Sequence, residues 1–191
     1  MTKHEIVNQL LPIFRRYGYE GTTLSRISEA TGLGKASLYH HFPKGKEEMA
    51  KAVLEHLKEW RQIHLINHLL GEGSPLERLL AMTESMRLVY DQGKQSCLLT
   101  ILSMGDSKES FSAQIQPAFE SLIETITVVL VDAGFSKQDA NERAEDAILQ
   151  IQGSLVLSRA LDNNSSFQRV MSRLPYSLLN INNQTSQTKG Q

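Results

Sequence analysis

Residues 22–46 constrain the fold of this chain more than any other segment. They predict a first helix from Leu24 to Thr31, which Thr23 or Thr22 can cap by accepting a hydrogen bond from an unpaired amide of the first turn. Gly32 is expected to end this helix, because glycine adopts a positive φ without steric cost. A second helix is expected from Lys35 to His41. Two short helices around a glycine turn predict a helix-turn-helix, whose second helix reads the major groove of DNA.

The predicted second helix has two different faces. Leu38 and Phe42 lie four residues apart and therefore share one face, which is expected to be buried. The other face is expected to present short, hydrogen-bonding side chains that can enter a groove. The candidates for groove contact are Lys35, Ala36, Ser37, Tyr39 and His40. His41 lies nearer the buried face, so both a DNA contact and a structural role stay open for it.

Residue types at many positions of this segment occur together at fixed spacings. The matching positions are Thr22, Thr23, Ile27, Gly32, Leu33, the run 38–42 and Lys46. Together they resemble the N-terminal domain of the TetR/AcrR family of transcriptional regulators. The resemblance implies that Tyr39 and Lys46 contact DNA phosphates, and that Thr23 does so through its hydroxyl or nearby amides. Residues 42–46 and 152–161 resemble the LmrA-like multidrug-type subgroup of that family.

Charge is unevenly distributed along the chain. Up to Lys46 there are seven lysines and arginines against three glutamates, a net charge of +4, so the remainder carries −5 of the total of −1. A basic N-terminal part is typical of a protein that binds phosphates with one end. Chance clustering is the alternative, and for Arg15, Arg16 and Arg26 a phosphate contact and simple solvation of a helix are both open.

Several other classes of protein receive no support from the sequence. No apolar run approaches the ~20 residues that span a bilayer, and the N-terminus lacks the apolar core of a signal peptide, so we expect a cytoplasmic protein with no membrane partner. Cys97 is the only cysteine, which excludes an intrachain disulfide. His64 and His68 have a metal-binding spacing but no evident third ligand, so no metal is predicted. No nucleophile elbow, phosphate-binding glycine loop or dinucleotide fingerprint occurs; we therefore expect no cofactor and no enzyme activity.

The whole chain is predicted to be all-α, with about nine helices. The first is expected to end near Gly18 and, because of Pro12, to kink between Asn8 and Leu11 rather than to fray in its first turn. Further helices are expected from Lys46 to Leu70, over residues 75–93, over 96–102 with Ser96 as cap, over 107–133 with a kink or fresh start at Pro117, over 136–161, and from 166 onward. The expected domains are a helix-turn-helix domain at 1–46 and a helical effector-binding and dimerisation domain at 47–181, with a disordered tail at 182–191.

The helix expected at 136–161 is apolar on two sides. Ile148, Ile151 and Leu155 form one stripe; a second consists of Leu149, Val156 and Ala160. Two-sided burial suggests that one stripe packs inside the subunit and the other on a partner. The family resemblance implies a homodimer built from the last two helices of each subunit. Such a dimer can present two recognition helices about one DNA turn apart, ~34 Å or a multiple, to a palindrome.

The family resemblance also implies an effector site in the second domain. Flexible or aromatic side chains of the kind found in such cavities are Trp60, Met86, Tyr90, Met104 and Phe111, although each can instead be a core residue. Cys97 is added to this set. It is either a small buried hydrophobe or, in the first turn of a helix capped by Ser96, a thiol sensor.

The sequence therefore predicts a DNA-binding transcriptional regulator, a repressor that binds a palindromic double-stranded operator as a dimer and is released by a small, largely apolar effector. One alternative is an effector-independent architectural DNA-binding protein. Another is a helical enzyme or hydrophobe carrier whose N-terminal part resembles a helix-turn-helix by chance.

Overall fold

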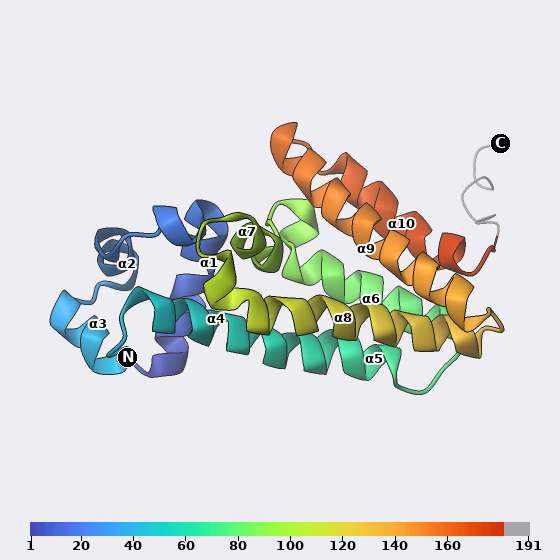
Figure 1. The fold of residues 1–191 in the computed structure, drawn as a ribbon. Helices are drawn as coiled ribbons and strands as arrows, with labels where there is room; N and C mark the ends of the chain where they lie inside the picture. The colour runs from blue at the N-terminus through green and yellow to red at the C-terminus, as the bar shows by residue number, and fades with distance from the viewer. Residues whose placement is uncertain (182–191) are drawn as a thin grey trace. The chain divides into compact units, whose positions relative to one another are not determined.

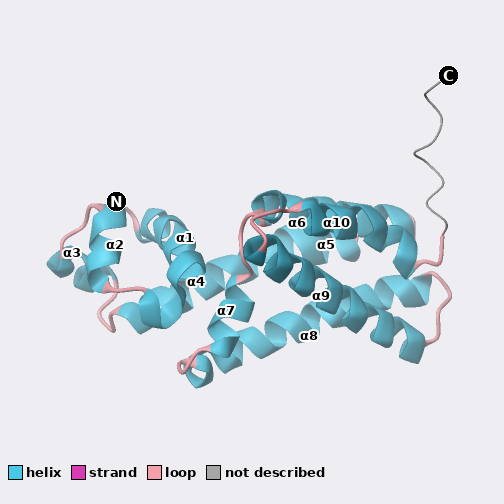
Figure 2. Ribbon diagram, turned by 90° about the horizontal axis from the view of Figure 1, so that it is seen from above, coloured by secondary structure: helices cyan, strands magenta, loops and turns pink. Residues whose placement is uncertain are grey.

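The computed structural model describes residues 1–181, and helices, turns and loops make up all of this part of the chain, with no strand in it (Figure 2). The predicted all-α fold is confirmed. The tail expected to be disordered, 182–191, lies outside the described residues. Across residues 1–181, no helix has both the length and the apolar character that crossing a bilayer requires.

The described residues pack into two compact units. The first combines Met1–Gln62 with Ser96–Glu120, and the second combines Ile63–Gln95 with the residues from Ser121 onward. This division follows packing and does not measure which residues bind DNA or effector. The functional domains expected at 1–46 and 47–181 therefore stay a prediction.

The first unit begins with α1 (Lys3–Gly21), which a capping box between Thr2 and Glu5 starts. Inside α1 the backbone leaves helical dihedral angles at Gly18, where φ is 66° and ψ is −171°. A kink is expected between Asn8 and Leu11, but the backbone departs from helical dihedral angles at Gly18 instead. Asn8 and Pro12 are both exposed, so the carbonyl that loses its proline partner can be solvated, and the regular dihedral angles persist.

The helix-turn-helix has the boundaries that the sequence predicts. Helix α2 is Leu24–Thr31 and helix α3 is Lys35–His41 (Figure 1). The Thr23 side chain accepts a hydrogen bond from the Arg26 amide at 3.3 Å, which satisfies one free donor of α2. Gly32 ends α2 with a φ of 68°, as expected for a left-handed terminal residue.

The core of the first unit joins the helix-turn-helix to residues much later in the chain. Ile27, Leu38 and Phe42 are fully buried, which confirms the predicted inner face of α3. The same cluster contains Leu98 and Leu102 from α7 (Leu98–Met104) and Phe111 and Ile115 from the first half of α8 (Lys108–Asp132). The N-terminal helices are therefore stabilised by apolar contacts with α7 and α8.

After the helix-turn-helix the chain remains helical from Lys46 to Leu69, close to the predicted span. It consists of α4 (Lys46–Arg61), a π-helical turn at Gln62–Ile66 and the short α5 (Asn67–Leu69). Glu47 and Glu48 lie in the first turn of α4, where carboxylates favour the positive end of the helix dipole.

Two expectations about the middle of the chain need correction or refinement. Cys97, not Ser96, is the N-cap residue of α7, because its extended backbone (φ −73°, ψ 116°) places the first helical residue at Leu98. The thiol therefore lies outside the first turn, in contrast to the premise of a sensor there, and the side chain is buried. Pro117 lies inside one continuous helix, α8, rather than at a fresh start.

The second unit contains α6 (Pro75–Val89), the 3₁₀ turn η2 (Asp91–Gly93), the rest of α8, α9 (Lys137–Ala160) and α10 (Ser165–Leu178). Helices α9 and α10 pack side by side (Figure 1). Capping by Ser74 and Ser136 starts α6 and α9. Arg78 is buried and donates to Asp132 at 2.8 Å, which ties α6 to the end of α8.

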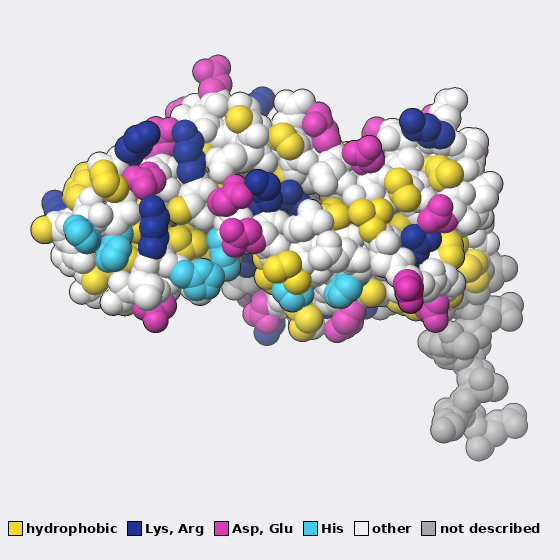
Figure 3. Space-filling model, turned by 90° about the horizontal axis from the view of Figure 1, so that it is seen from below, with side chains coloured by type: hydrophobic (Ala, Val, Ile, Leu, Met, Phe, Trp, Pro, Cys, Tyr) yellow, Lys and Arg dark blue, Asp and Glu magenta, His cyan; other side chains and the backbone are white. Residues whose placement is uncertain are grey.

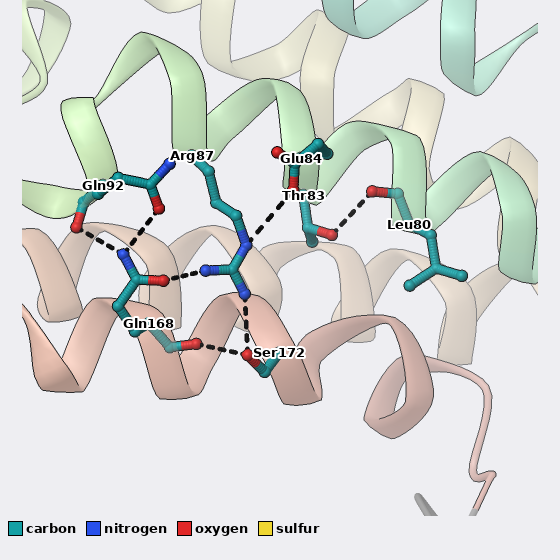
Figure 4. A network of polar contacts seen from close by, with 7 residues as sticks. All are labelled: Leu80, Thr83, Glu84, Arg87, Gln92, Gln168 and Ser172. Carbon is teal, nitrogen blue, oxygen red and sulfur yellow. Dashed lines mark hydrogen bonds and ion pairs between the residues drawn. The ribbon is translucent and has the colours of Figure 1, made fainter. Parts of the chain in front are cut away.

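A polar network joins α6, η2 and α10 (Figure 4). The Arg87 guanidinium donates to Gln168 Oε1 and, at 2.8 Å, to Ser172 Oγ. Gln168 Nε2 donates in turn to the carbonyl and the side-chain oxygen of Gln92, at 2.8 and 2.9 Å. Gln92 has a φ of 56°, so these bonds hold a backbone conformation that few side chains adopt.

Candidate nucleic-acid interface

Helix α3 presents most of its predicted contact residues to solvent. Lys35, Ala36 and His40 are exposed, and the Tyr39 side chain is 46% exposed. Ser37 and His41 are half-buried, which fits their positions at the borders of this face. Around α3, on the left of Figure 3, lysine, arginine and histidine side chains lie among hydrophobic ones.

A groove of about 490 Å³ lies beside this face and contains the three residues implied as phosphate contacts, Thr23, Tyr39 and Lys46. These come from the start of α2, from α3 and from the start of α4. The other lining residues are Tyr19, Thr22, Leu24, Pro43, Lys44, Gly45 and Glu47. The fold thus brings four hydroxyl-bearing side chains and two lysines to one concave surface, a donor set suited to an anionic oxygen.

The ring of Tyr39 packs against the start of α4. Gly45 precedes α4 with a φ of 68° and a ψ of −143°, a conformation that is strained for residues with a side chain. A Cβ on Gly45 would lie 3.4 Å from the Tyr39 ring and 3.7 Å from its hydroxyl. Glycine therefore permits the turn into α4, and the Tyr39 ring would be in ordinary van der Waals contact with a Cβ at this position.

Lys46 is held at the groove by Tyr19. Its Nζ donates to the Tyr19 carbonyl at 2.8 Å and lies 4.1 Å from the centre of the Tyr19 ring. Burial raises the pKa of the Tyr19 phenol, and the charges of Glu47 and Glu20 raise it further. The Tyr19 phenol is therefore uncharged near neutral pH, and its ring lies beside the Lys46 ammonium.

The nearby carboxylate of Glu48 is already engaged. It accepts a hydrogen bond from the Lys44 amide at 3.0 Å and one from Lys3 Nζ at 3.1 Å. These bonds lower the pKa of Glu48, the amide of Lys44 making the largest contribution. The Glu48 carboxylate therefore pairs with Lys44 and Lys3, whereas the Lys46 ammonium donates to the Tyr19 carbonyl.

A second depression, of about 330 Å³, lies between α1 and α2 and includes Arg16, Tyr17 and Arg26. Both guanidinium groups lie over the Tyr17 ring, at 5.2 and 4.2 Å. Arg26 also donates to the Gly21 carbonyl. Arg26 thus has a structural partner, and phosphate contact by Arg16 or Arg26 stays a prediction.

Two family descriptions match most of the chain. Residues 6–53 match "Bacterial regulatory proteins, tetR family", and residues 75–173 match "Transcriptional regulator LmrA/YxaF-like, C-terminal domain". The chain belongs to the TetR family. It is a DNA-binding transcriptional regulator, and the proteins of the matched families are not enzymes. Regulators of this family bind DNA and typically dimerise.

Individual relatives agree with the family. The TetR-family chain is 25% identical to the HTH-type transcriptional regulator LmrA of Bacillus subtilis over 183 residues, which cover 91% of this chain and 95% of LmrA. It is 35% identical to the biofilm operon icaADBC negative transcriptional regulator IcaR of Staphylococcus epidermidis over 66 residues, 35% of this chain and 36% of IcaR. A TetR regulator from Legionella pneumophila has the same fold, with a TM-score of 0.80 and 21% identity over 93% of this chain and 97% of that one.

The residues expected to line an effector site in this TetR-family regulator are divided between the two compact units. Trp60, Cys97, Met104 and Phe111 belong to the first unit, and Met86 and Tyr90 to the second. Phe111 is fully buried in the core, and its ring lies 5.0 Å from that of Tyr19. Met104 is 75% exposed, whereas Met86 is buried. The Tyr90 ring contacts the Phe167 ring at 6.1 Å.

Sequence reasoning assigned a contact to three of the ten groove residues, and the seven that it missed include Tyr19 and Gly45. Tyr19 reaches Lys46 across 27 positions of sequence, a pairing that no local periodicity indicates. Gly45 did carry a usable signal, because a glycine directly before a predicted helix indicates a turn that needs a positive φ. No group of three or more His, Cys, Asp or Glu is placed to hold a metal ion within residues 1–181.

Proposed function

We propose that this TetR-family regulator is a repressor that binds a palindromic operator as a homodimer and is released from it by a small, largely apolar effector. The observation that carries the proposal is the groove that joins Thr23, Tyr39 and Lys46 beside the exposed face of α3. A phosphate in this groove would place α3 against the bases of the major groove.

The contacts divide into two kinds. Thr23, Tyr39 and Lys46 bind the DNA backbone and set the position of the protein. Base edges are read by the exposed α3 residues Lys35, Ala36 and His40 and by the half-buried Ser37, with His41 at the border. The N-terminal excess of positive charge supports this assignment, since phosphate contacts supply much of the affinity for DNA.

Dimerisation is supported by the two faces of α9. Ile148, Ile151 and Leu155 are at most 8% exposed and pack inside the subunit. Leu149 and Val156, seven residues apart, are 69% and 57% exposed. Such large apolar side chains on one helix face are suited to a partner subunit, and α9 with α10 of each copy would form that interface.

Repression is supported by the relatives, because IcaR is described as a negative transcriptional regulator. Effector release rests on the Met and aromatic residues, together with one cysteine, that are predicted to line a site: Trp60, Met86, Tyr90, Cys97, Met104 and Phe111. The effector would favour a state in which the spacing of the two α3 helices no longer matches the half-sites. A repressor of this kind acts in the cytoplasm, where its operator lies.

The test is footprinting and gel retardation with the DNA upstream of the protein's own gene. Y39A and K46A should weaken binding to all sequences, and K46A should reduce the salt dependence by about one phosphate contact. S37A and H40A should instead change which sequence is preferred, by about 1–3 kcal/mol per altered base contact. If the protein does not retard this DNA even at low salt, the proposal is wrong. A thermal-shift screen of apolar compounds tests the effector; stabilisation by none of them would favour an effector-independent DNA-binding protein.

A further inference from the structure

The last turn of α1 connects the groove to the turn between α7 and α8, all within the first compact unit. On one side, Tyr19 offers its carbonyl and its ring to the Lys46 ammonium, at 2.8 and 4.1 Å. On the other side, its ring meets the fully buried Phe111 of α8 edge-on, at 5.0 Å. Tyr19 is therefore fixed between the first half of α8 and a predicted phosphate contact.

The neighbouring residue, Glu20, is bound by the α7–α8 turn. Its Oε1 accepts two hydrogen bonds from Ser107, one from the amide at 3.0 Å and one from the hydroxyl at 2.8 Å. Gly105 lies so close that a Cβ there would be 2.8 Å from a Glu20 carboxylate oxygen. Residues 105–107 thus contact this exposed carboxylate, and the Ser107 hydrogen bonds lower the pKa of Glu20, so it is charged near neutral pH.

We propose that Glu20 is a positioning residue for DNA binding: bound by Ser107, it fixes the last turn of α1 so that Tyr19 holds the Lys46 ammonium at the groove. This inference rests on the proposed function, since it assumes that Lys46 contacts a DNA phosphate. Glu20 itself makes no DNA contact. Its role is to transmit the position of the α7–α8 turn to Lys46 through one adjacent residue.

The direction in which DNA affinity changes when Glu20 is removed distinguishes positioning from simple charge repulsion. A carboxylate near DNA repels phosphates, so its removal should by itself strengthen binding. Positioning predicts the opposite for Glu20, because an unfixed Tyr19 leaves Lys46 free to sample other positions. Glu29, an exposed carboxylate of α2 in the same unit, provides the matched charge control.

The experiment measures the affinity of the full-length protein for its upstream duplex over a range of salt concentrations, with E20A, E20Q, S107A and E29A. E20A should lower the affinity on the order of tenfold, as expected when one charged hydrogen bond is lost. S107A should lower it less, E20Q should restore part of it because its amide oxygen still accepts, and E29A should leave it unchanged or raise it. Thermal unfolding identifies any variant that loses DNA affinity because it misfolds. If E20A is such a variant, the affinity of S107A decides the test.

A double-mutant cycle with Lys46 makes the test specific. In a K46A background, E20A should have no further effect on affinity or on its salt dependence. An equal loss in both backgrounds would show that Glu20 merely caps the turn before α8, and an unchanged affinity of E20A and S107A would also overturn the inference. These outcomes differ from failure of the proposed function, in which the wild-type protein itself would not bind the duplex.

Discussion

The ring of Tyr39 packs against Gly45, so closely that a side-chain carbon on Gly45 would lie 3.4 Å from the ring. The groove depends on this glycine for the positive φ of the turn that starts α4 at Lys46, and Tyr39 packs on that turn. The pair therefore links the stability of the turn to the geometry of the predicted phosphate contact.

We expect G45A to lose about 1–3 kcal/mol of unfolding free energy, because alanine is strained in this backbone conformation. It should also weaken DNA binding, since relief of this strain would shift the start of α4 and with it Lys46 and the turn on which Tyr39 packs. Gly32 supplies the control, because its φ is also 68° but, among described residues, nothing lies within 4 Å of an added Cβ. G32A should lose about 1–2 kcal/mol yet retain DNA affinity. Urea unfolding and gel retardation measure the two effects, and equal DNA affinities for G45A and G32A would contradict the role of the turn at Gly45.

Placing a charge on the exposed face of α9 should separate the subunits of the proposed dimer. L149E and V156E put a carboxylate where 69% and 57% of the apolar side chain is exposed, so the folded subunit should change stability by no more than about 0.5 kcal/mol. In the dimer the same charges would be buried without a partner, which is costly. Sedimentation should therefore show monomers.

Leu88 of α6 provides the control for this dimer test, because its side chain is 68% exposed in the same compact unit. L88E should sediment like the wild type. A dimer that persists in both α9 variants would place the interface elsewhere.

Removal of the Gln168 amide should destabilise the second unit. In Q168A the Arg87 guanidinium loses an acceptor and the carbonyl of Gln92 loses a donor, so we expect a loss of about 1–3 kcal/mol in chemical unfolding. The neighbouring R169A removes only an exposed hydrogen bond within α10 and should stay within about 0.5 kcal/mol of the wild type. Similar losses for both variants would mean that the network adds nothing beyond an ordinary surface contact.

The histidine pair between α1 and α4 should make stability depend on pH. The rings of His4 and His56 lie 5.2 Å apart. Burial lowers the pKa of His56 from its ordinary value of 6.5, and the charge of His4 lowers it further, against an opposing effect of Glu59. The unfolded state then takes up a proton at a higher pH than the folded state, so the unfolding free energy should fall as the pH drops below 6.5 toward the folded pKa.

Urea unfolding at pH 7.5 and pH 5.5 tests this prediction, and the decrease should be smaller in H56Q than in the wild type. H68Q, which removes an exposed histidine of α5, is the control for the loss of one imidazole. If H56Q shows the full pH dependence of the wild type, the decrease has another source.

Local sequence signals predicted the helix-turn-helix well. The boundaries of α2 and α3 follow from Thr23, Gly32 and the spacing of Leu38 and Phe42, because capping, positive φ and helical periodicity act over only a few residues. Two local predictions were wrong because the surroundings of the residue, and not its type alone, decided the backbone conformation. Pro12 lies on an exposed face that tolerates it, and the extended backbone of Cys97 moves the start of α7 past Ser96.

The sequence by itself determined the helical fold class, the family and the residues of α3 that face outward, since each depends on residue types at short spacings. Only the tertiary structure decided that Tyr19 holds Lys46, that Ser107 binds Glu20, and that α7 and α8 complete the core around the helix-turn-helix. These contacts join residues between 27 and 87 positions apart. Their pairing depends on how whole helices pack their apolar faces, a property that no single stretch of sequence encodes.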